Sequence, residues 1–416
     1  MASKPVAQPP QGAQEGEPPR VIRFRSSLRN TVLDVMRHRG WKETDAEVDW
    51  EIFWAEREWI HQCFDHVRLN DVQRVNHFRN HYELTRKDLL IKNLKRMKKQ
   101  LEREERALEA SKFDFFPGTY VLPQEFGMWK EEFKQRQGVT WIMKPIAKSQ
   151  GKGIFLVNKL SQVTDWKRDH PDPSDSYIIQ RYLDNPYLIG GKKFDLRIYC
   201  LVTSYSPLTA YLYRSGFGRF SFHRFTMNSR DMGNSYVHLT NVAIQKTAPD
   251  YDPNAGCKWD LHHLKMYMIS KHGEGPVNEL FANIQALIIR SLLAVQKVII
   301  NDKHCFELYG YDILIDDHLK PWLLEVNASP SLTADTWMDY ELKFALLTDV
   351  FDVLDIEGDE TKIGGFDLIY RGAPVLHPPT CSATLLGAHN PVARSPPHVI
   401  PARYFAHAHG GHAGPP

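Results

Sequence analysis

The sequence contains few cysteines, and their spacing excludes two classes of protein. The five are scattered along the chain at Cys63, Cys200, Cys257, Cys305 and Cys381. None forms a CxxC pair, so the sequence supports neither a zinc ribbon nor a disulfide framework. We therefore expect reduced thiols.

Strong net charge and long apolar runs are also missing. The formal net charge is only +2 at pH 7, so no overall electrostatic field favours nucleic acid. The longest apolar runs, such as Ala286–Val295, are interrupted by charge well before they reach a membrane-spanning length. We predict no nucleic-acid partner and no membrane insertion.

The length and composition indicate a globular protein of several lobes, since 42% of the 416 residues are hydrophobic. The segment 85–110 has no glycine or proline and shows helical apolar spacing, with Thr85 as a candidate N-cap, so it predicts a long basic helix. We expect a disordered leader at 1–20, an N-terminal α/β lobe at 21–116 that includes this helix, a central lobe at 117–183, a C-terminal catalytic lobe at 184–358 and a disordered Pro-, Ala- and His-rich tail at 359–416.

Two short apolar strands near residues 309–330 carry acidic residues where Val or Ile would be expected. Asp312 lies in the first strand, and Glu325 and Asn327 lie in the second, on one face by the period-two rule. A hairpin through 316–320 would bring all three side chains together, and hard oxygen ligands of this kind suit Mg²⁺ on nucleotide phosphates. The alternative is that Asp312 caps a strand end and Glu325 lies on a solvated edge.

A glycine-rich loop, KSQGKG, lies between the predicted strands 141–145 and 154–157. P-loop and dinucleotide fingerprints need a helix after the glycines, so this position argues against both. Lys144 would meet phosphates as a point charge, while Gly151 and Gly153 would let backbone N–H groups close over them. The whole pattern predicts an α/β protein of the ATP-grasp fold, with a nucleotide held between two antiparallel sheets.

Several longer segments resemble the tubulin tyrosine ligase-like family of amino-acid ligases, and within it the short polyglutamylases. The resemblance covers roughly Arg23 to Gly358. It rests on the segments WIMKPIAKSQGKGIFL, YIIQRYLDNPYLIGGKKFDLRIYCLV, HLTNVAIQK, ELYGYDILID and KPWLLEVNASPSLTADTWMDYELKFAL.

The resemblance implies roles for individual residues. Those implied to contact ATP are Lys144, Gln150, Gly151, Gln180, Arg181, Tyr182, Leu183, Lys193, Phe194, Asp195, Thr240 and Asn241. Those implied to bind magnesium are Asp312, Glu325 and Asn327, and those implied to hold the incoming glutamate are Arg219, Lys258 and Lys343, with Arg219, Glu325 and Lys343 as the catalytic set. Taken alone, Arg219 reads equally as a surface residue at a strand end, and Lys343 as an exposed position on a helix.

The activity that the resemblance implies is ATP- and Mg²⁺-dependent glutamylation. The acceptor would be the γ-carboxyl of a glutamate in the tubulin C-terminal tail, activated as an acyl phosphate and joined to L-glutamate through an isopeptide bond. Accessory protein subunits, work on microtubules in the cytoplasm and cytoskeleton, and a place at cilium basal bodies and flagellar axonemes are implied by analogy alone. The alternative function is a weakly active core subunit or microtubule-binding scaffold.

Overall fold

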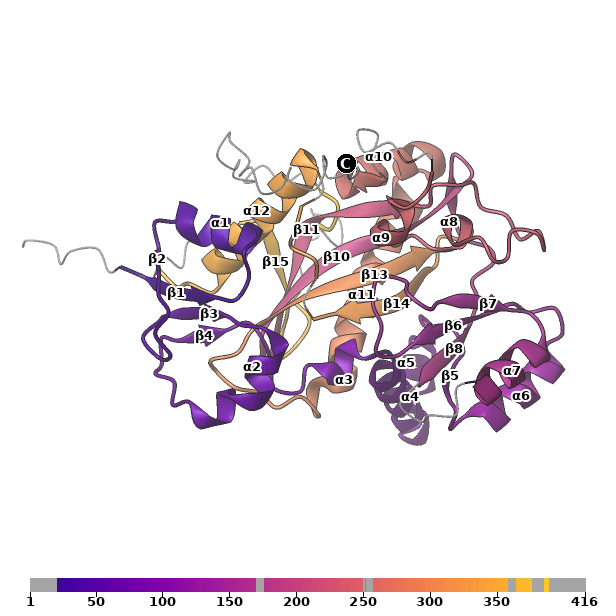
Figure 1. The fold of residues 1–416 in the computed structure, drawn as a ribbon, viewed down its shortest axis with the longest axis horizontal. Helices are drawn as coiled ribbons and strands as arrows, with labels where there is room; N and C mark the ends of the chain where they lie inside the picture. The colour runs from indigo at the N-terminus through magenta and orange to yellow at the C-terminus, as the bar shows by residue number, and fades with distance from the viewer. Residues whose placement is uncertain are drawn as a thin grey trace, which may run out of the picture.

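The computed structural model describes residues 21–169, 176–249, 251, 257–328, 330–334, 336–357, 364–375 and 385–388. Three β-sheets form the framework of these residues (Figure 1). A parallel sheet lies near the N-terminus, a large antiparallel sheet occupies the middle, and a second antiparallel sheet lies beside it. The predicted α/β class with antiparallel sheets is confirmed. The predicted leader at 1–20 lies outside the described residues.

The N-terminal lobe is built on four short parallel strands in the order β2-β1-β3-β4. Its elements are β1 (Arg23–Ser26), α1 (Thr31–His38), β2 (Lys42–Glu43), β3 (Ile52–Trp54), α2 (Arg57–Gln62), the 3₁₀ turn η1 (Phe64–His66) and β4 (Arg74–Val75). Side chains of α1, β1 and β3 pack with the C-terminal helix α12 (Trp337–Val353) in one hydrophobic cluster. The lobe is thereby joined to α12, which lies about 300 residues later in the sequence.

The predicted long helix over 85–110 is divided into three helices. They are α3 (Tyr82–Thr85), α4 (Lys87–Arg103) and α5 (Ala107–Ser111). Thr85 does not cap α4, because it ends α3 and its hydroxyl donates to the His81 carbonyl at 3.2 Å. Glu105 has φ 59°, a left-handed conformation that follows the end of α4. The buried face of α4 includes Leu90 and Leu94.

The central sheet has the strand order β12-β11-β10-β13-β14, with β15 paired to β11 and β9 paired to β10. Its strands are β9 (Leu188–Ile189), β10 (Lys192–Tyr205), β11 (Leu208–Phe220), β12 (Lys258–Asp260), β13 (Glu307–Ile315), β14 (Pro321–Asn327) and β15 (Phe366–Arg371). The short helices α8 (Ser235–His238) and α9 (Val242–Gln245) interrupt the connection from β11 to β12. All these strand pairs are antiparallel.

Strand β10 is buried on both faces. Because its side chains point alternately to the two faces, one set packs in one core cluster and the other set faces the second cluster and the pocket. Leu196, Ile198 and Cys200 pack in the cluster that also contains α10 (Leu261–His272) and α11 (Glu274–Gln296). Tyr199 and Leu201 point the other way, into the cluster with α12. Lys193 and Asp195 share the parity of this second set, so the same alternation directs them to one face.

The second antiparallel sheet has the strand order β5-β8-β6-β7. It consists of β5 (Thr119–Leu122), β6 (Trp141–Pro145), β7 (Phe155–Val157) and β8 (Tyr177–Arg181), with α6 (Phe126–Gln135) and α7 (Leu160–Asp169) packed against it. The strands predicted at 141–145 and 154–157 pair antiparallel as expected. The glycine-rich loop therefore connects two neighbouring strands.

The C-terminal segment and the longest helix differ in how they meet the sequence-based expectations. The predicted disordered tail at 359–416 is wrong for residues 366–371, because β15 pairs with β11 and buries Phe366 and Ile369. The rest of that tail, apart from residues 364–375 and 385–388, lies outside the described residues. Helix α11 is long and apolar enough to cross a membrane, but half of the relevant window is buried, and this packing against α4 and α10 is that of a core helix.

Candidate active site

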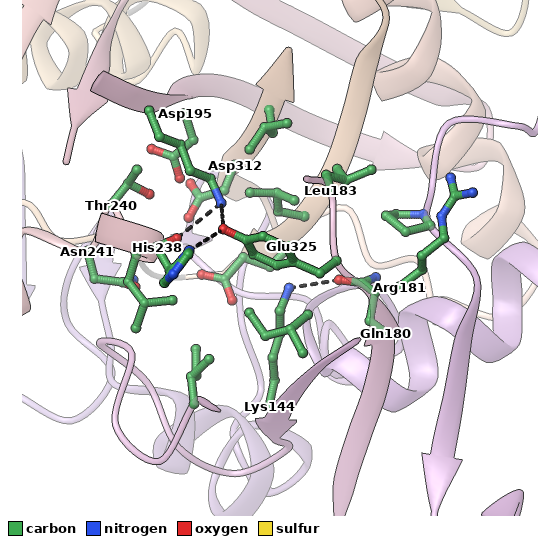
Figure 2. A pocket seen from close by; sticks show the side chains of 18 residues that line it. Lys144, Gln180, Arg181, Leu183, Asp195, His238, Thr240, Asn241, Asp312 and Glu325 are labelled. Atoms are coloured by element: carbon green, nitrogen blue, oxygen red, sulfur yellow. Dashed lines mark hydrogen bonds between the residues drawn. The ribbon is translucent and has the colours of Figure 1, made fainter. Parts of the chain in front are cut away.

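A pocket opens between the β5-β8-β6-β7 sheet and the central sheet (Figure 2). Both sheets and the segment 238–241 contribute to its walls. The polar lining residues are Lys144, Gln180, Arg181, Tyr182, Lys193, Asp195, His238, Thr240, Asn241, Asp312 and Glu325, and the apolar ones are Pro117, Ile142, Ile154, Leu183, Leu239, Leu314 and Leu324. Eleven of the predicted site residues, including Leu183, therefore meet in one cavity.

Lys144 lies on β6 and points into the pocket (Figure 2). Its ammonium donates to Gln180 Oε1 at 2.8 Å, and Gln180 Nε2 donates to Thr119 Oγ1 at 2.9 Å. Burial lowers the pKa of Lys144 to about 8, although Glu325 acts in the opposite direction. A bound anion next to this lysine would therefore favour its protonated, charged form.

Lys193 forms a second buried cation on β10. Its ammonium donates to the Tyr182 hydroxyl and to the His238 carbonyl, both at 3.0 Å. The Tyr182 hydroxyl also contacts His238 Nδ1 at 2.9 Å. Burial lowers the pKa of Lys193 to about 7, because water no longer solvates the ammonium. Lys144 and Lys193 therefore meet in one pocket, where a bound anion would favour their charged forms.

Two arginines and two aspartates form a buried network beside the lysines. Arg219 donates to Asp195 Oδ1 and Oδ2 at 2.8 and 2.6 Å, and it contacts Asp312 Oδ2 at 2.8 Å. Arg197 donates to Asp312 Oδ1 and Oδ2 at 2.6 and 3.2 Å. Burial alone would raise the pKa of Asp312, but the two guanidinium groups outweigh it and lower this pKa. Asp312 is therefore ionised.

The acidic hairpin has the predicted geometry. Asp312 lies directly opposite Glu325 in the register of β13 and β14, and Asn327 follows two residues later on the same face. Asp312 is in mid-strand and 2% exposed, so the alternative that it caps a strand end is wrong. Glu325 lies on the edge strand β14 with its side chain 27% exposed, and Lys87 Nζ contacts its Oε2 at 3.4 Å.

This donor set could hold a divalent cation. A carboxylate offers about four lone-pair sites, and the arginines use three of those on Asp312, which leaves one on Oδ1. Asn327 makes its contacts through Nδ2, with the Gly310 carbonyl and Glu325 Oε1 at 3.4 and 3.5 Å. The three residues therefore fit a hard cation that prefers oxygen ligands.

The glycine-rich loop folds back toward α9. Gln150 has φ 61° and is exposed, and Gly151 has φ 78°. A Cβ atom on Gly151 would lie 2.4 Å from Ile244 Cδ1 and 2.8 Å from Asn241 Oδ1, so only glycine fits there. The loop is thereby brought next to the Thr240–Asn241 wall of the pocket.

The three cations implied for an amino-acid substrate also converge. Lys258 on β12 lies opposite Arg219 on β11, and directly opposite side chains share a face. Lys258 Nζ and Lys343 Nζ both contact Asp339 Oδ2, at 3.0 and 2.9 Å. Arg219 and Lys343 are 6% and 2% exposed, so the alternatives that place them on the surface are wrong.

The structure does not place Phe194 in the pocket. Its ring stacks on Phe220 with the centroids 5.0 Å apart, in the core beside α10. The cause is strand alternation, which puts Phe194 on the face opposite to Lys193 and Asp195. Phe194 is therefore a core residue on the face of the sheet opposite to the pocket.

Sequence reasoning missed His238, which lines the pocket and contacts Tyr182 and Lys193. It also missed three residues that contact the predicted ones. Arg197 lies two positions after Asp195, and period two alone could have placed it on the same face. Asp339 precedes Lys343 by one helical turn, which is a spacing for a contact. Lys87 had no local signal, because its contact with Glu325 joins α4 to β14 across the fold.

Comparisons with known proteins agree with this architecture. A model of the tubulin-tyrosine ligase family matches residues 66–363. The chain is 52% identical over 403 residues to a probable tubulin polyglutamylase TTLL9 of Bos taurus, covering 88% of this chain and 87% of that one. It is 50% identical over 360 residues to a probable tubulin polyglutamylase ttll-9 of Caenorhabditis elegans, covering 85% of each chain.

A more distant relative extends the match. The chain is 44% identical over 388 residues to a probable alpha-tubulin polyglutamylase Ttll1 of Tetrahymena thermophila, covering 85% of this chain and 93% of that one. The family model spans well over half of the sequence, and the identities hold over most of each relative. This chain therefore belongs to the tubulin-tyrosine ligase family.

Proposed function

We propose that this protein is an ATP- and Mg²⁺-dependent ligase that adds glutamate to the γ-carboxyl of glutamates in tubulin tails. Membership of a ligase family and the names of the polyglutamylase relatives support the reaction class and the substrate. The observation that carries the proposal is the pocket itself. It brings two buried lysines next to the acidic hairpin, whose Asp312 is ionised, and it lies beside a group of three cations.

The nucleotide would lie between the two sheets. Ile142 and Leu239 form one apolar wall of the pocket, and Leu183, Leu314 and Leu324 form another, which suits the two faces of a purine. The residues from Gln180 to Leu183 would run along the base edge. Lys144 and Lys193 would bind the phosphates as cations.

The oxygen atoms of Asp312, Glu325 and Asn327 would bind the metal ion. When bound, Mg²⁺ supplies charge neutralisation for the phosphates, and ATP supplies the phosphoryl group that activates the acceptor carboxylate. Arg197 and Arg219 hold Asp312 ionised and fixed, and their guanidinium groups would also offset the negative charge that gathers between carboxylate and phosphate.

The donor amino acid would bind at Arg219, Lys258 and Lys343. A glutamate carries two carboxylates, and a site with three converging cations favours it over glycine or tyrosine. Its α-amine would then face the activated acceptor near the metal end of the pocket. We expect the three cations to contribute to the reaction by orienting this amine.

The proposal is tested with microtubules and lysate from cells that express the full chain. Incorporation of labelled glutamate is compared for the wild type, Glu325→Gln and the control Glu131→Gln, whose side chain is exposed on α6. Labelled glycine and tyrosine serve as competing donors. We expect glutamate incorporation that Glu325→Gln abolishes and Glu131→Gln retains. Equal incorporation with Glu325→Gln would show that the acidic hairpin is not catalytic, and a scaffold function would replace the ligase.

We further propose that full activity requires accessory subunits, on microtubules of the cytoskeleton such as those of cilia and flagella. The reason is the limited basic surface that the segment 85–110 offers to an acidic partner, since its positive charge is diluted toward the end by Glu102, Glu104, Glu105 and Glu109. Rapid glutamylation by the purified chain alone would contradict this dependence.

A further inference from the structure

The proposed donor site contains an acidic residue that no assigned role uses. Asp339 lies in the first turn of α12, and its backbone N–H donates to the Thr336 hydroxyl at 3.2 Å. Its carboxylate is 1% exposed, although burying a carboxylate is unfavourable unless partners compensate. Two of the partners of its carboxylate are the lysines proposed to bind the donor.

The first of these lysines comes from an edge strand that provides little support by itself. Strand β12 has three residues and pairs only with β11 within the described part of the sheet. The Lys258 ammonium lies 4.9 Å from the centre of the Phe217 ring and 3.0 Å from Asp339 Oδ2. A lysine side chain is flexible, so these two contacts help to hold its ammonium in place.

The second lysine lies one helical turn after Asp339. Lys343 donates to Asp339 Oδ2 at 2.9 Å and to the Thr333 carbonyl at 2.7 Å, and its side chain is 3% exposed. Both lysines therefore contact the same oxygen atom. Two ammonium groups so close together repel each other, and a carboxylate between them offsets the repulsion.

Asp339 remains charged in this position. Burial opposes its ionisation, but the ammonium groups of Lys343 and Lys258 outweigh burial and hold its pKa below the ordinary value. The row Lys258–Arg219–Asp195 crosses three neighbouring strands, so the lysine pair lies next to the nucleotide pocket. A displaced Lys258 would change the distance between the donor site and the reacting carboxylate.

We propose that Asp339 is the positioning residue of the donor site, which holds Lys258 and Lys343 together so that they bind a carboxylate of the incoming amino acid. This inference rests on the proposed ligase function. Asp339 acts through the lysines and does not itself contact the donor. It therefore determines the affinity for a donor that carries a side-chain carboxylate, and it leaves nucleotide binding alone.

The test uses the full chain, isolated by an affinity tag together with its cellular partners. KM for glutamate and KM for ATP are measured for the wild type and for Asp339→Asn, which keeps the shape and removes the charge. We expect KM for glutamate to rise at least about tenfold, with KM for ATP within about twofold. The control is Asp349→Asn, a buried carboxylate on the same helix that accepts from the Tyr213 hydroxyl and the Gly365 N–H.

A double-mutant cycle with Lys258→Gln separates positioning from general destabilisation. If Asp339 acts through Lys258, then Asp339→Asn adds much less than its single effect in that background. An unchanged KM for glutamate, or a parallel rise of both KM values that Asp349→Asn reproduces, would overturn the inference. If Asp339→Asn does not fold, the same measurements are made with Asp339→Glu, which keeps the charge and displaces it.

Failure of the proposed function gives a different result. A wild type that transfers no glutamate, with or without its partners, would refute the ligase and this inference together. A wild type that transfers glutamate with a KM insensitive to Asp339 would refute the inference alone.

Discussion

Replacing Lys193 with methionine should stabilise the free protein and abolish its use of nucleotide. Burial lowers the pKa of Lys193 from 10.5 to about 7, and each unit corresponds to about 1.4 kcal/mol. The lysine therefore destabilises the fold by as much as roughly 5 kcal/mol at low pH. Methionine removes that penalty but also the hydrogen bonds to Tyr182 and His238, at about 1 kcal/mol each. We expect a net gain of about 1–3 kcal/mol in the free energy of unfolding.

The pH dependence follows from the sign of this shift. Between pH 7 and 10.5 the unfolded chain binds a proton that the folded chain has released, so Lys193 makes the wild type more stable as pH rises through this window. Nucleotide binding should show the opposite trend. A polyphosphate favours the charged lysine, so binding takes up protons, and the affinity should fall by up to about tenfold per pH unit above pH 7. Lys144, with a pKa of about 8, adds to this fall at higher pH.

Two assays check the reasoning. Thermal unfolding of the wild type, Lys193→Met and the control Lys192→Met at pH 7 and pH 9 measures stability, since Lys192 is only half-buried on the same strand. Calorimetry of nucleotide binding in two buffers with different ionisation heats measures proton uptake. A Lys193→Met protein less stable than the wild type at both pH values would refute the reasoning, as would nucleotide affinity that is constant from pH 7 to 9.

Three further predictions concern the loop, the core and the metal. Gly151→Ala should lower activity at least tenfold, because the added Cβ would collide with Ile244. The control Gly138→Ala has φ 85° and open space around it, so it should keep activity and lose about 1 kcal/mol of stability. Phe194→Leu should lower the free energy of unfolding by about 1–2 kcal/mol and leave KM for ATP unchanged. A raised KM for ATP would show that Phe194 contributes to nucleotide binding after all. Asn327→Ala should raise the Mg²⁺ concentration needed for half-maximal activity about tenfold or more, and an unchanged requirement would remove Asn327 from the metal set.

The local parts of the fold could be predicted from the sequence. The β13–β14 hairpin has a short turn and alternating strands, so its register brings Asp312 opposite Glu325 without information from elsewhere in the chain. The same alternation contradicted the assignment of Phe194, which stood between Lys193 and Asp195. Strand β15 was missed because it is short and is followed by a Pro-rich segment, and only its pairing with β11 explains it.

The long-range parts of the site could not be derived in the same way. Lys87 reaches Glu325 from α4, and Lys258 reaches Asp339 from another part of the chain. These contacts depend on how the sheets and helices pack, which no period in the sequence encodes. The burial of Arg219 and Lys343 could not be predicted from the sequence either, because charged side chains are usually found at the surface.

The place of each function in the central sheet has an evolutionary consequence. The acidic hairpin and the two arginines that fix Asp312 are carried by the strands β10, β11, β13 and β14, where each side chain is held by several neighbours. The lysine pair is carried by a three-residue edge strand and by α12, outside that framework. Under the proposed assignment, mutations on β12 or in the first turns of α12 would therefore alter donor recognition by the lysines while the residues proposed for phosphate and metal stay unchanged. In a lineage with this fold, we therefore expect changes of donor specificity to begin at this margin of the sheet.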